Sequence, residues 1–290
     1  MKNFGLIGAS GYIAPRHAKA IKETGHKIVT YLDPHDNVGY MDQYFPEAKY
    51  FKDTELFDRH LDNVRRNETP VDFVSICSPN YLHDSHIRLG LRNKCDVICE
   101  KPIVLKSSHI DALKEIEKET GKKVYTILQL RHHPEIIKLK QKVKKDKKYV
   151  VDLTYITPRG QWYNHSWKGD EDKSGGVLFN IGIHFFDMLM WIFGDVSSHN
   201  VEINETYSKG FIELENARIN YFLSLNKEDL PWDEWKPYRN ISVDGEQIEF
   251  SQGFTDLHTK SYEEIIKGNG FGLDDIKPVI KMIEKLKTLK

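Results

Sequence analysis

The sequence is short of the features that would place it in several large classes of protein. It has three cysteines, Cys77, Cys95 and Cys99, an odd number in or beside apolar runs, which is typical of reduced, buried thiols and not of a secreted disulfide framework. Neither sign of charge is in excess, because 42 Lys and Arg residues stand against 43 Asp and Glu residues. The balance provides no basic field for nucleic acid and no acidic excess typical of disorder.

Long uncharged apolar runs, repeats and low-complexity segments are also missing. Residues 1–3 lead straight into a strand-like run, without the cationic and then apolar segment of a signal peptide. The most apolar later stretch, 179–193, is interrupted by His184 and Asp187, which argues against a membrane span. We therefore expect a soluble cytoplasmic protein whose 290 residues form about two domains.

A glycine-rich turn lies between the first predicted strand and the first predicted helix. Residues 4–7 are apolar, residues 8–14 read Gly-Ala-Ser-Gly-Tyr-Ile-Ala, and a helical pattern follows to Gly25. Gly8 would permit a tight turn, and Gly11 would let backbone N–H groups approach a pyrophosphate at the helix N-terminus. The motif is one residue longer than G-x-G-x-x-G, so by itself it also fits a plain glycine turn.

An acidic residue follows the second predicted strand, 27–32. Asp33 lies 25 positions after Gly8, where it can accept hydrogen bonds from a ribose diol and repel a 2′-phosphate. Asp33-Pro34 is also a turn signal when it is taken alone. The two signals at this separation together predict NAD as the cofactor.

Alternating strands and helices continue to residue 128. Apolar runs at 71–76, 96–99 and 124–128 predict strands, a helical pattern ends near Leu91, and Ser107 or Ser108 is placed to cap another helix. The strand at 96–99 ends at Glu100-Lys101-Pro102, at the edge where a doubly wound sheet binds its ligands. As a tetrapeptide alone, Cys99-Glu100-Lys101-Pro102 is also compatible with ordinary solvated turn residues. The alternation predicts a Rossmann domain, a doubly wound parallel sheet, over residues 1–128.

The pattern changes after Leu128. A lysine-rich helix after Pro134 is interpreted as a solvated face, because a nucleic-acid arm would also carry aromatics or arginines; its lysines are Lys138, Lys140, Lys142, Lys144, Lys145, Lys147 and Lys148. A strand at 150–155, a long polar and aromatic loop at 158–176 and a buried helix from Asn180 follow. Short alternating runs between Val201 and Phe250 predict a mostly antiparallel open sheet, with final helices at 261–266 and 273–289. The second domain is therefore expected to be of the α+β class over residues 129–290.

Four motifs in one order resemble the glucose-fructose oxidoreductase/inositol dehydrogenase/MocA family over essentially the whole chain. They are the turn at 8–14 with His17, Ser78-Pro79-Asn80 with His83, Glu100-Lys101-Pro102, and Gly182-Ile183-His184 with Asp187. The resemblance implies a Rossmann domain that binds NAD(P) and a C-terminal substrate domain whose sheet joins the chain into a tetramer or dimer. It also implies that the lysine of Glu-Lys-Pro and a second-domain histidine flank the sugar carbon that yields hydride.

Within this family the chain is most similar to the UDP-N-acetylglucosaminuronic acid 3-dehydrogenases of bacterial O-antigen synthesis. The residues that carry this resemblance lie at 14–17, 75–84, 127–131, 159–163, 166–170 and 173–176. It implies NAD-dependent oxidation of C3 of UDP-N-acetyl-D-glucosaminuronic acid to the 3-oxo sugar in lipopolysaccharide nucleotide-sugar synthesis. The wider family often has Asp four positions before its histidine, whereas this chain has Asn180. The alternatives are another sugar or inositol dehydrogenase and a non-catalytic NAD-binding sensor.

The predicted site has three sets of residues. The catalytic pair is His184, whose imidazole titrates near neutral pH, and Lys101, which would hold the reacting oxygen. We expect NAD at Gly8, Ala9, Gly11, Tyr12, Ile13, Asp33, Ser78, Pro79, Asn80, His83, Glu100, Lys101 and Gln129. Because a UDP-sugar acid needs cations and stacking surfaces, we expect this substrate at Lys101, Arg131, Arg159, Trp162, Tyr163, Trp167, Lys168, Lys173, Asn180 and His184.

Each set has a structural alternative. A lone histidine on an apolar helix is ordinarily a satisfied core residue, and the aromatic side chains could pack in a domain core or at a subunit interface. His184 and Asp187 with His132 and His133 could bind a metal, but zinc needs three or four converging ligands and no cysteine spacing completes the set. We therefore predict no metal, no nucleic acid and no membrane partner.

Overall fold

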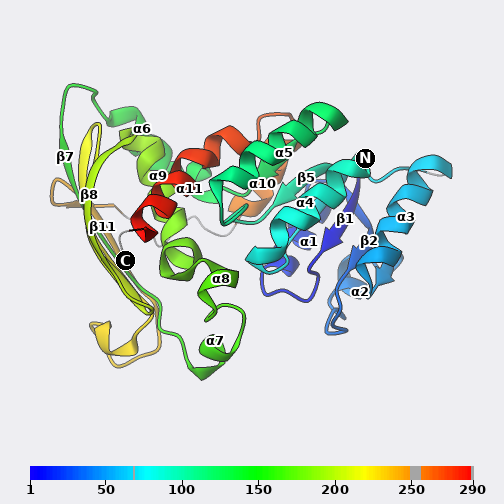
Figure 1. Ribbon diagram of the computed structural model, residues 1–290, viewed down its shortest axis with the longest axis horizontal. Coiled ribbons are helices and arrows are strands. Elements are labelled where there is room, and N and C mark those ends of the chain that lie inside the picture. Colours follow the sequence, from blue (N-terminus) through cyan, green and yellow to red (C-terminus); the bar gives the residue numbers. More distant parts are fainter. Residues whose placement is uncertain (68, 249–255, 289–290) are drawn as a thin grey trace. The chain divides into compact units, whose positions relative to one another are not determined.

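The chain divides into two compact units in a computed structural model that describes residues 1–67, 69–248 and 256–288 (Figure 1). The first unit is Met1–Gln129 with Asp256–Lys277, and the second is Leu130–Thr255 with Pro278–Lys290. The expected boundary after residue 128 lies next to this division, but 256–277, expected in the second domain, packs with the first unit. The predicted ends at Phe250 and Leu289 lie outside the described residues.

The first unit is built on a six-stranded parallel sheet with the order β3-β2-β1-β4-β5-β6. Its strands are β1 (Asn3–Ile7), β2 (Lys27–Leu32), β3 (Lys49–Phe51), β4 (Phe73–Ile76), β5 (Asp96–Cys99) and β6 (Val124–Thr126). Every residue of β1 and β4 is buried, because both faces of the sheet are covered. The predicted doubly wound sheet is confirmed, and all three cysteines are free and buried, as expected.

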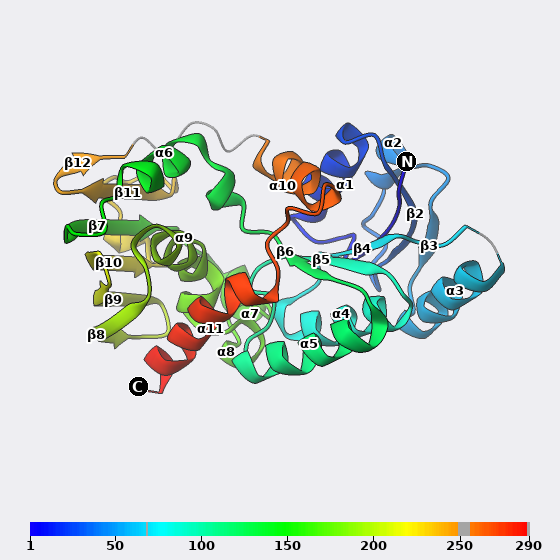
Figure 2. The same cartoon turned by 90° about the horizontal axis from the view of Figure 1, so that it is seen from above.

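Helices cover the two faces of this sheet. They are α1 (Ala14–Glu23), α2 (Met41–Tyr44), α3 (Thr54–Asn67), α4 (His83–Arg92), α5 (Ser107–Thr120) and α10 (Leu257–Ile266), with short 3₁₀ turns η1 (Asn80–Leu82) and η2 (Gln129–His132). Figure 2 shows α1 and α10 side by side on one face and α4 and α5 on the other. The expected serine cap of α5 is wrong, because Lys106 occupies the N-cap position and makes no side-chain cap hydrogen bond.

The second unit contains a six-stranded sheet with the order β12-β11-β7-β10-β9-β8. Its strands are β7 (Tyr149–Ile156), β8 (Val196–Ile203), β9 (Tyr207–Leu214), β10 (Ala217–Ser224), β11 (Tyr238–Val243) and β12 (Glu246–Gln247). The β7–β10 pair is parallel and the other pairs are antiparallel, as the prediction of a mostly antiparallel sheet requires. Tyr149, Val151 and Leu153 are buried while Val150 and Asp152 between them are exposed, so one face carries the core.

The helices of the second unit are α6 (Pro134–Lys142), α7 (Gln161–His165), α8 (Glu171–Ser174), the π-helical turn η3 (Leu178–Gly182), α9 (Ile183–Phe193), the 3₁₀ turn η4 (Lys227–Asp229) and the part of α11 (Leu273–Lys287) from Pro278 onward. The predicted long loop therefore contains two short helices. The lysine-rich helix ends at Lys142, so its last four expected lysines lie in the turn before β7.

Within the part of the chain that the structure describes, one segment is long and apolar enough to cross a membrane. It runs from Glu171 to Phe193, and the mean hydropathy of its most apolar window is 1.6. In the folded chain 72% of that window is buried inside the protein. This burial is typical of a core helix of a soluble domain.

Candidate active site

The glycine turn after β1 is pressed against the end of β4. Gly8 has φ +83°, and a Cβ atom added there would lie 2.4 Å from the backbone nitrogen of Ser78. A Cβ at Gly11 would lie 3.0 Å from the carbonyl oxygen of Cys77. Only glycine fits at position 8, because its φ is positive and because a side chain there would collide with the backbone of Ser78. The turn therefore lies between β1 and β4, where the strand order reverses and doubly wound sheets bind ligands.

Asp33 is held rigidly at the end of β2. Its carboxylate is buried, and it accepts hydrogen bonds from the backbone N–H of Ser10 at 2.8 Å and of His35 at 2.9 Å. The hydroxyl of Tyr50 lies 3.0 Å from the carbonyl oxygen of Asp33 and 2.8 Å from that of His35. The acid is thus tied to the glycine turn, and the sequence did not indicate Tyr50 as its support.

Glu100 follows β5 and is surrounded by N–H groups. Its Oε1 lies 2.9 Å from His17 Nε2, on α1, and 3.1 Å from His258 Nε2, on α10. Its Oε2 accepts the backbone N–H of Lys101 at 3.2 Å. All three acid and histidine side chains are buried. The carboxylate that was predicted to contact NAD is therefore directed at two helices that cover the sheet.

A second layer supports this arrangement. The hydroxyl of Tyr262 lies 2.8 Å from His17 Nδ1 and 2.7 Å from the hydroxyl of Ser75. Burial lowers the pKa of His17 in spite of the adjacent carboxylate. Burial alone would raise the pKa of Glu100, but the hydrogen bonds from His17 and His258 outweigh it and hold that pKa well below its ordinary value. At neutral pH the pair is therefore an anionic Glu100 and a neutral His17.

His83 joins the chain segments that follow β4 and β5. Its Nδ1 lies 2.7 Å from the carbonyl oxygen of Pro102, and its Nε2 lies 2.8 Å from that of Ser78. Burial lowers the pKa of His83, and a neutral imidazole has one N–H, so it donates to one of the two carbonyls at a time. Ser78 Oγ in turn lies 2.8 Å from His86 Nδ1. The ring thus faces backbone on both sides, and its contact with NAD stays a prediction.

Near the end of β6, two buried polar atoms have no hydrogen-bond partner among the described residues. They are Gln129 Oε1 and Thr126 Oγ1. Buried polar atoms of this kind need a partner, such as water or a ligand. Together with the glycine turn that only Gly8 can form, they fit a polar ligand such as a dinucleotide.

The remaining residues predicted to bind NAD have very different exposures. Ala9 is fully buried, Asn80 is buried at the start of η1, and 87% of Tyr12 is exposed at the tip of the glycine turn. Ile13, Pro79 and Lys101 are half-buried. The structure therefore collects the predicted set along one edge of the sheet, at the carboxyl ends of β1, β2, β4, β5 and β6.

In the second unit, Asn180 ties the segment that contains α7 and α8 to the turn before α9. Its Nδ2 donates to Tyr163 Oη at 2.8 Å and to the carbonyl oxygen of Lys168 at 3.3 Å. His184 is the second residue of α9 and is half-buried. Three predicted substrate residues are therefore joined by hydrogen bonds. Asn180, which joins them, lies in the turn that leads to the predicted base, His184.

Two cations lie close together beside this contact. Burial, and then the positive charge of Arg159, lowers the pKa of Lys168. The Arg159 guanidinium lies 5.7 Å from the ring centre of Tyr163, and Lys168 Nζ lies 5.3 Å from the ring centre of Trp167. Like charges in a partly desolvated position are stabilised when an anion binds. Arg159 and Lys168 are thus suited to an anionic group.

Other predicted substrate residues have different partners. Arg131 is buried and forms two hydrogen bonds with Asp187, at 3.0 and 2.7 Å. Lys173 pairs with Asp170 at 3.0 Å at the surface, and 71% of Trp162 is exposed. The structure therefore does not gather all the predicted cations in one place. Asp187, one of the residues considered above as a metal ligand, is thus the ion-pair partner of Arg131.

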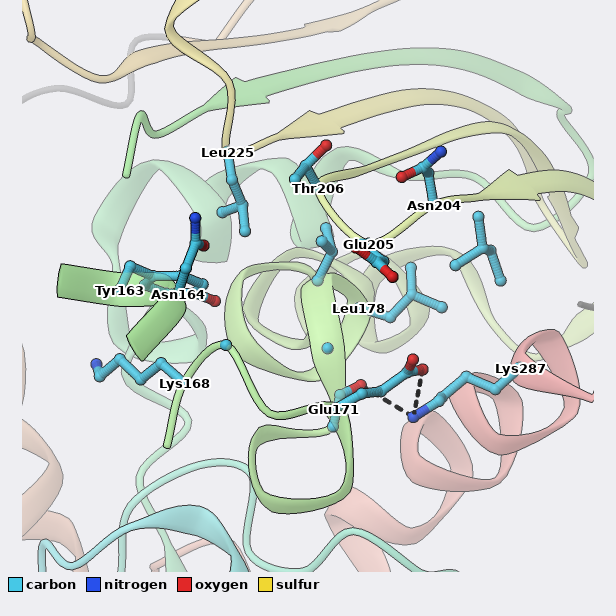
Figure 3. Close-up of a pocket in the computed structure, with 15 residues that line it drawn as sticks. Tyr163, Asn164, Lys168, Glu171, Leu178, Asn204, Glu205, Thr206, Leu225 and Lys287 are labelled. Atoms are coloured by element: carbon cyan, nitrogen blue, oxygen red, sulfur yellow. Dashed lines mark hydrogen bonds and ion pairs between the residues drawn. The ribbon is translucent and has the colours of Figure 1, made fainter. Parts of the chain in front are cut away.

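A cavity of about 510 Å³ is lined in part by Lys168 (Figure 3). Its lining includes Tyr163 and Lys168, the turn between β8 and β9 at Asn204, and Lys287 of α11, whose Nζ lies 3.1 Å from Glu171 Oε1. Apolar side chains form part of the same wall, among them Leu178. The cavity offers both polar groups and apolar surface next to Lys168.

Family models match much of the chain. Residues 2–128 match the NAD-binding Rossmann fold of the GFO/IDH/MocA oxidoreductase family, and residues 146–216 match its C-terminal alpha/beta domain. The chain resembles a crystal structure of the WlbA (WbpB) dehydrogenase from Thermus thermophilus in complex with NAD and alpha-ketoglutarate. The two sequences are 48% identical and the structures superpose with a TM-score of 0.96, over 100% of this chain and 96% of that one. The chain belongs to the GFO/IDH/MocA oxidoreductase family. The predicted family, the enzyme class and the NAD cofactor are thereby confirmed.

A second structure of that dehydrogenase and a more distant relative are also similar to this chain. A second structure of the Thermus thermophilus WlbA (WbpB) dehydrogenase, with NAD and UDP-GlcNAcA, is 47% identical with a TM-score of 0.95 over the same shares of both chains. The 2,7-anhydro-N-acetylneuraminate hydratase of Escherichia coli is 25% identical over 202 residues, which are 68% of this chain and 50% of the relative. The chain spans about half the length, or less, of the first curated relatives it matches.

Sequence reasoning missed three residues of this oxidoreductase that complete the surroundings of Glu100: Ser75, His258 and Tyr262. A signal was present in α10, where polar residues share the buried face with apolar ones; the buried set is Leu257, His258, Ser261, Tyr262 and Ile265. Buried polar side chains at helical spacing predict hydrogen-bond partners. They do not indicate which distant residue the partner is, because that depends on how α10 packs.

Proposed function

We propose that this chain catalyses the NAD-dependent oxidation of C3 of UDP-N-acetyl-D-glucosaminuronic acid to the 3-oxo sugar. The observation that carries the proposal is its likeness along the whole chain to a dehydrogenase crystallised with NAD and UDP-GlcNAcA, at 47% identity. The adjacent cations Arg159 and Lys168 support it, since both the pyrophosphate and the carboxylate of this substrate are anionic.

In this proposal the first unit binds the cofactor and the reacting oxygen. NAD, when bound, supplies the hydride acceptor. The backbone N–H groups of the turn at Gly8 and Gly11 hold the pyrophosphate, and Asp33 accepts hydrogen bonds from a ribose diol. Gln129 offers its buried side-chain oxygen to a polar N–H of the cofactor. Lys101 donates to the sugar oxygen and stabilises the negative charge that develops there.

The second unit provides the base and recognises the substrate. His184 takes the hydroxyl proton, because an imidazole titrates close to neutral pH. Asn180 holds Tyr163 in place through a hydrogen bond. Arg159 and Lys168 bind an anionic group of the substrate. Trp162 and Trp167 offer surfaces on which the base or sugar can stack. Arg131 and Lys173 contribute less direct binding, since each already pairs with an aspartate.

The deciding experiment is an absorbance assay at the NADH wavelength. Purified protein is mixed with NAD and UDP-N-acetylglucosaminuronic acid, and NADH is expected to form in the wild type and to form at least about 100-fold more slowly in Lys101→Ala. The assay is repeated with alpha-ketoglutarate, which is present in one Thermus structure. Re-oxidation of NADH in place would pass its hydride to alpha-ketoglutarate, so the absorbance would stay low while the 3-oxo sugar, measured by mass spectrometry, accumulates over many turnovers. Without this acid the 3-oxo sugar would stop at one turnover. Tight NAD binding without any NADH would favour a sensor over an enzyme.

The wider setting is part of the same proposal. We assign the reaction to nucleotide-sugar synthesis for lipopolysaccharide or O-antigen, in the cytoplasm, by a tetramer or dimer formed through the sheet of the second unit. The partly apolar outer face of that sheet, with 46% of Val150 exposed, supports an interface there. Sedimentation of the purified protein tests the oligomer, and a monomer at micromolar concentration would contradict it.

A further inference from the structure

The hydrogen bonds around Glu100 can be given one direction each. Both oxygens of a carboxylate only accept, so His17 and His258 donate through Nε2 and Lys101 donates through its backbone N–H. Since the neutral ring of His17 has its proton on Nε2, its Nδ1 accepts from the hydroxyl of Tyr262.

The next bond completes the chain of donors. The hydroxyl of Tyr262 is used as a donor to His17, so its oxygen accepts from the hydroxyl of Ser75 at 2.7 Å. Each hydrogen bond in the series from Ser75 through Tyr262 and His17 to Glu100 then has one donor and one acceptor. A buried anion that accepts three N–H groups is fixed in position, because moving it would leave donors and acceptor unpaired in a dry interior.

We propose that His17 and His258 are positioning residues for Lys101, which they hold in place through Glu100. Neither histidine needs to touch substrate or cofactor. One oxygen of Glu100 faces both histidines, while the other holds the backbone N–H of Lys101. The inference rests on the proposed function, since it names what fixes the lysine of that reaction.

The same three residues could instead bind a metal ion, because their ligand atoms lie within 4.8 Å of one another. A zinc ion needs nitrogen and oxygen ligands at about 2.0–2.2 Å, and normally a fourth ligand. Here one oxygen lies at hydrogen-bond distance from both histidine nitrogens, at 2.9 and 3.1 Å. The side chains are buried and paired as they are, which favours the hydrogen-bonded arrangement.

The test compares two substitutions of His258 with a control. His258→Leu removes the donor, whereas His258→Gln retains an N–H group that can reach Glu100. His26→Gln is the control. His26 precedes β2 and takes no part in the hydrogen bonds described around Glu100; its ring accepts from the backbone N–H of Lys2 and stacks against Phe4. A shift of a reacting group by about 1 Å costs about 100-fold in rate. We expect His258→Leu to lower kcat by about 30- to 100-fold, with the KM for the UDP-sugar and the Kd for NAD changed less than about threefold.

The two comparison variants should behave differently from His258→Leu. His258→Gln should recover kcat to within about fivefold of wild type, and His26→Gln should leave it unchanged. A drop in kcat for His258→Gln as large as for His258→Leu would contradict a role based on hydrogen bonding.

A double-mutant cycle separates positioning from general loss of structure. If His258 acts through Lys101, then His258→Leu should lower the residual rate of Lys101→Ala by less than about twofold. A loss of 30-fold or more in that background would mean that His258 acts by another route, and would overturn the proposal.

A readout without turnover keeps this inference distinct from the proposed function. Hydrogen exchange of the segment around Lys101 should be faster in His258→Leu than in wild type, His258→Gln or His26→Gln. Wild-type protein that fails to reduce NAD with the UDP-sugar would contradict the function, while the exchange result would still decide the inference. One equivalent of zinc in the purified protein, lost in His258→Leu, would overturn it in favour of a metal site.

Discussion

The surroundings of Glu100 in the first unit differ sharply from the Arg159–Lys168 pair in the second. Around Glu100 the charge is buried and is matched by hydrogen bonds within the chain. At the second site two positive charges adjoin each other, and Arg159 is exposed. The first arrangement is complete before any ligand arrives, whereas the second is best satisfied by an anionic ligand. In the proposed function, the chemical step would therefore depend on a preformed hydrogen-bonded group, and substrate recognition on cations that gain a partner only when an anion binds.

The largest expected effect is on the chemical step. His184→Ala should lower turnover by about 100- to 10,000-fold, with little change in UDP-sugar affinity, because the base acts on a proton that leaves only in the transition state. Single-turnover rates with prebound NAD measure this step alone. Wild-type NAD reduction by His184→Ala across pH 6 to 9 would make His184 a packing residue and leave the base unassigned.

A buried histidine of the first unit, His86, should also make stability depend on pH. Burial lowers the pKa of His86 from 6.5 to about 4, so between these values the unfolded chain binds a proton that the folded chain does not. The free energy of unfolding should therefore fall as the pH drops from 7 to 4, by about 3 kcal/mol from this residue. Urea titrations at pH 7, 5.5 and 4 should show a shallower fall for His86→Gln. The exposed His165→Gln should keep the wild-type slope, and an equal effect of both variants would contradict the assignment.

Cofactor choice is expected to change by a smaller amount. Asp33 repels a 2′-phosphate, so NAD should bind tens of times more tightly than NADP, which corresponds to about 2 kcal/mol. Asp33→Asn should reduce the preference for NAD over NADP and should also weaken NAD binding. The substitution leaves the backbone N–H of either Ser10 or His35 facing an amide NH₂ group, which cannot accept its hydrogen bond. Calorimetric dissociation constants for both cofactors test it, and equal values in wild type would show that Asp33 does not discriminate.

The exposed rim should give the smallest effect. UDP-N-acetylglucosamine, which lacks the carboxylate, should bind at least about tenfold more weakly than the uronic acid, or about 1.4 kcal/mol. Arg159→Ala should reduce that difference, whereas Lys173→Ala should change it less, because Lys173 already pairs with Asp170. Equal turnover of the two sugars by wild type would show that the carboxylate is not recognised.

The sequence predicted best where local chemistry decides the structure. Strands β2 and β5 have the predicted bounds, and the glycine turn lies where its motif placed it, since neighbouring residues determine each of them. The role of α10 was not predictable in this way. Nothing near His258 in the sequence identifies Glu100, 158 positions away, as its partner. Likewise, the pairing of Arg131 with Asp187 could not be predicted, because it depends on how η2 and α9 pack.

The position of α10 has a consequence for how the protein is made. Glu100 leaves the ribosome long before His258, and residues 130–255 of the second unit are synthesised between them. A nascent chain that has reached Gln129 has every strand of the parallel sheet but lacks one of the two histidines that donate to the buried carboxylate. The first unit is therefore completed only after most of the second unit has been made, and a transplant of this first unit into another enzyme has to include residues 256–277 as a separate piece.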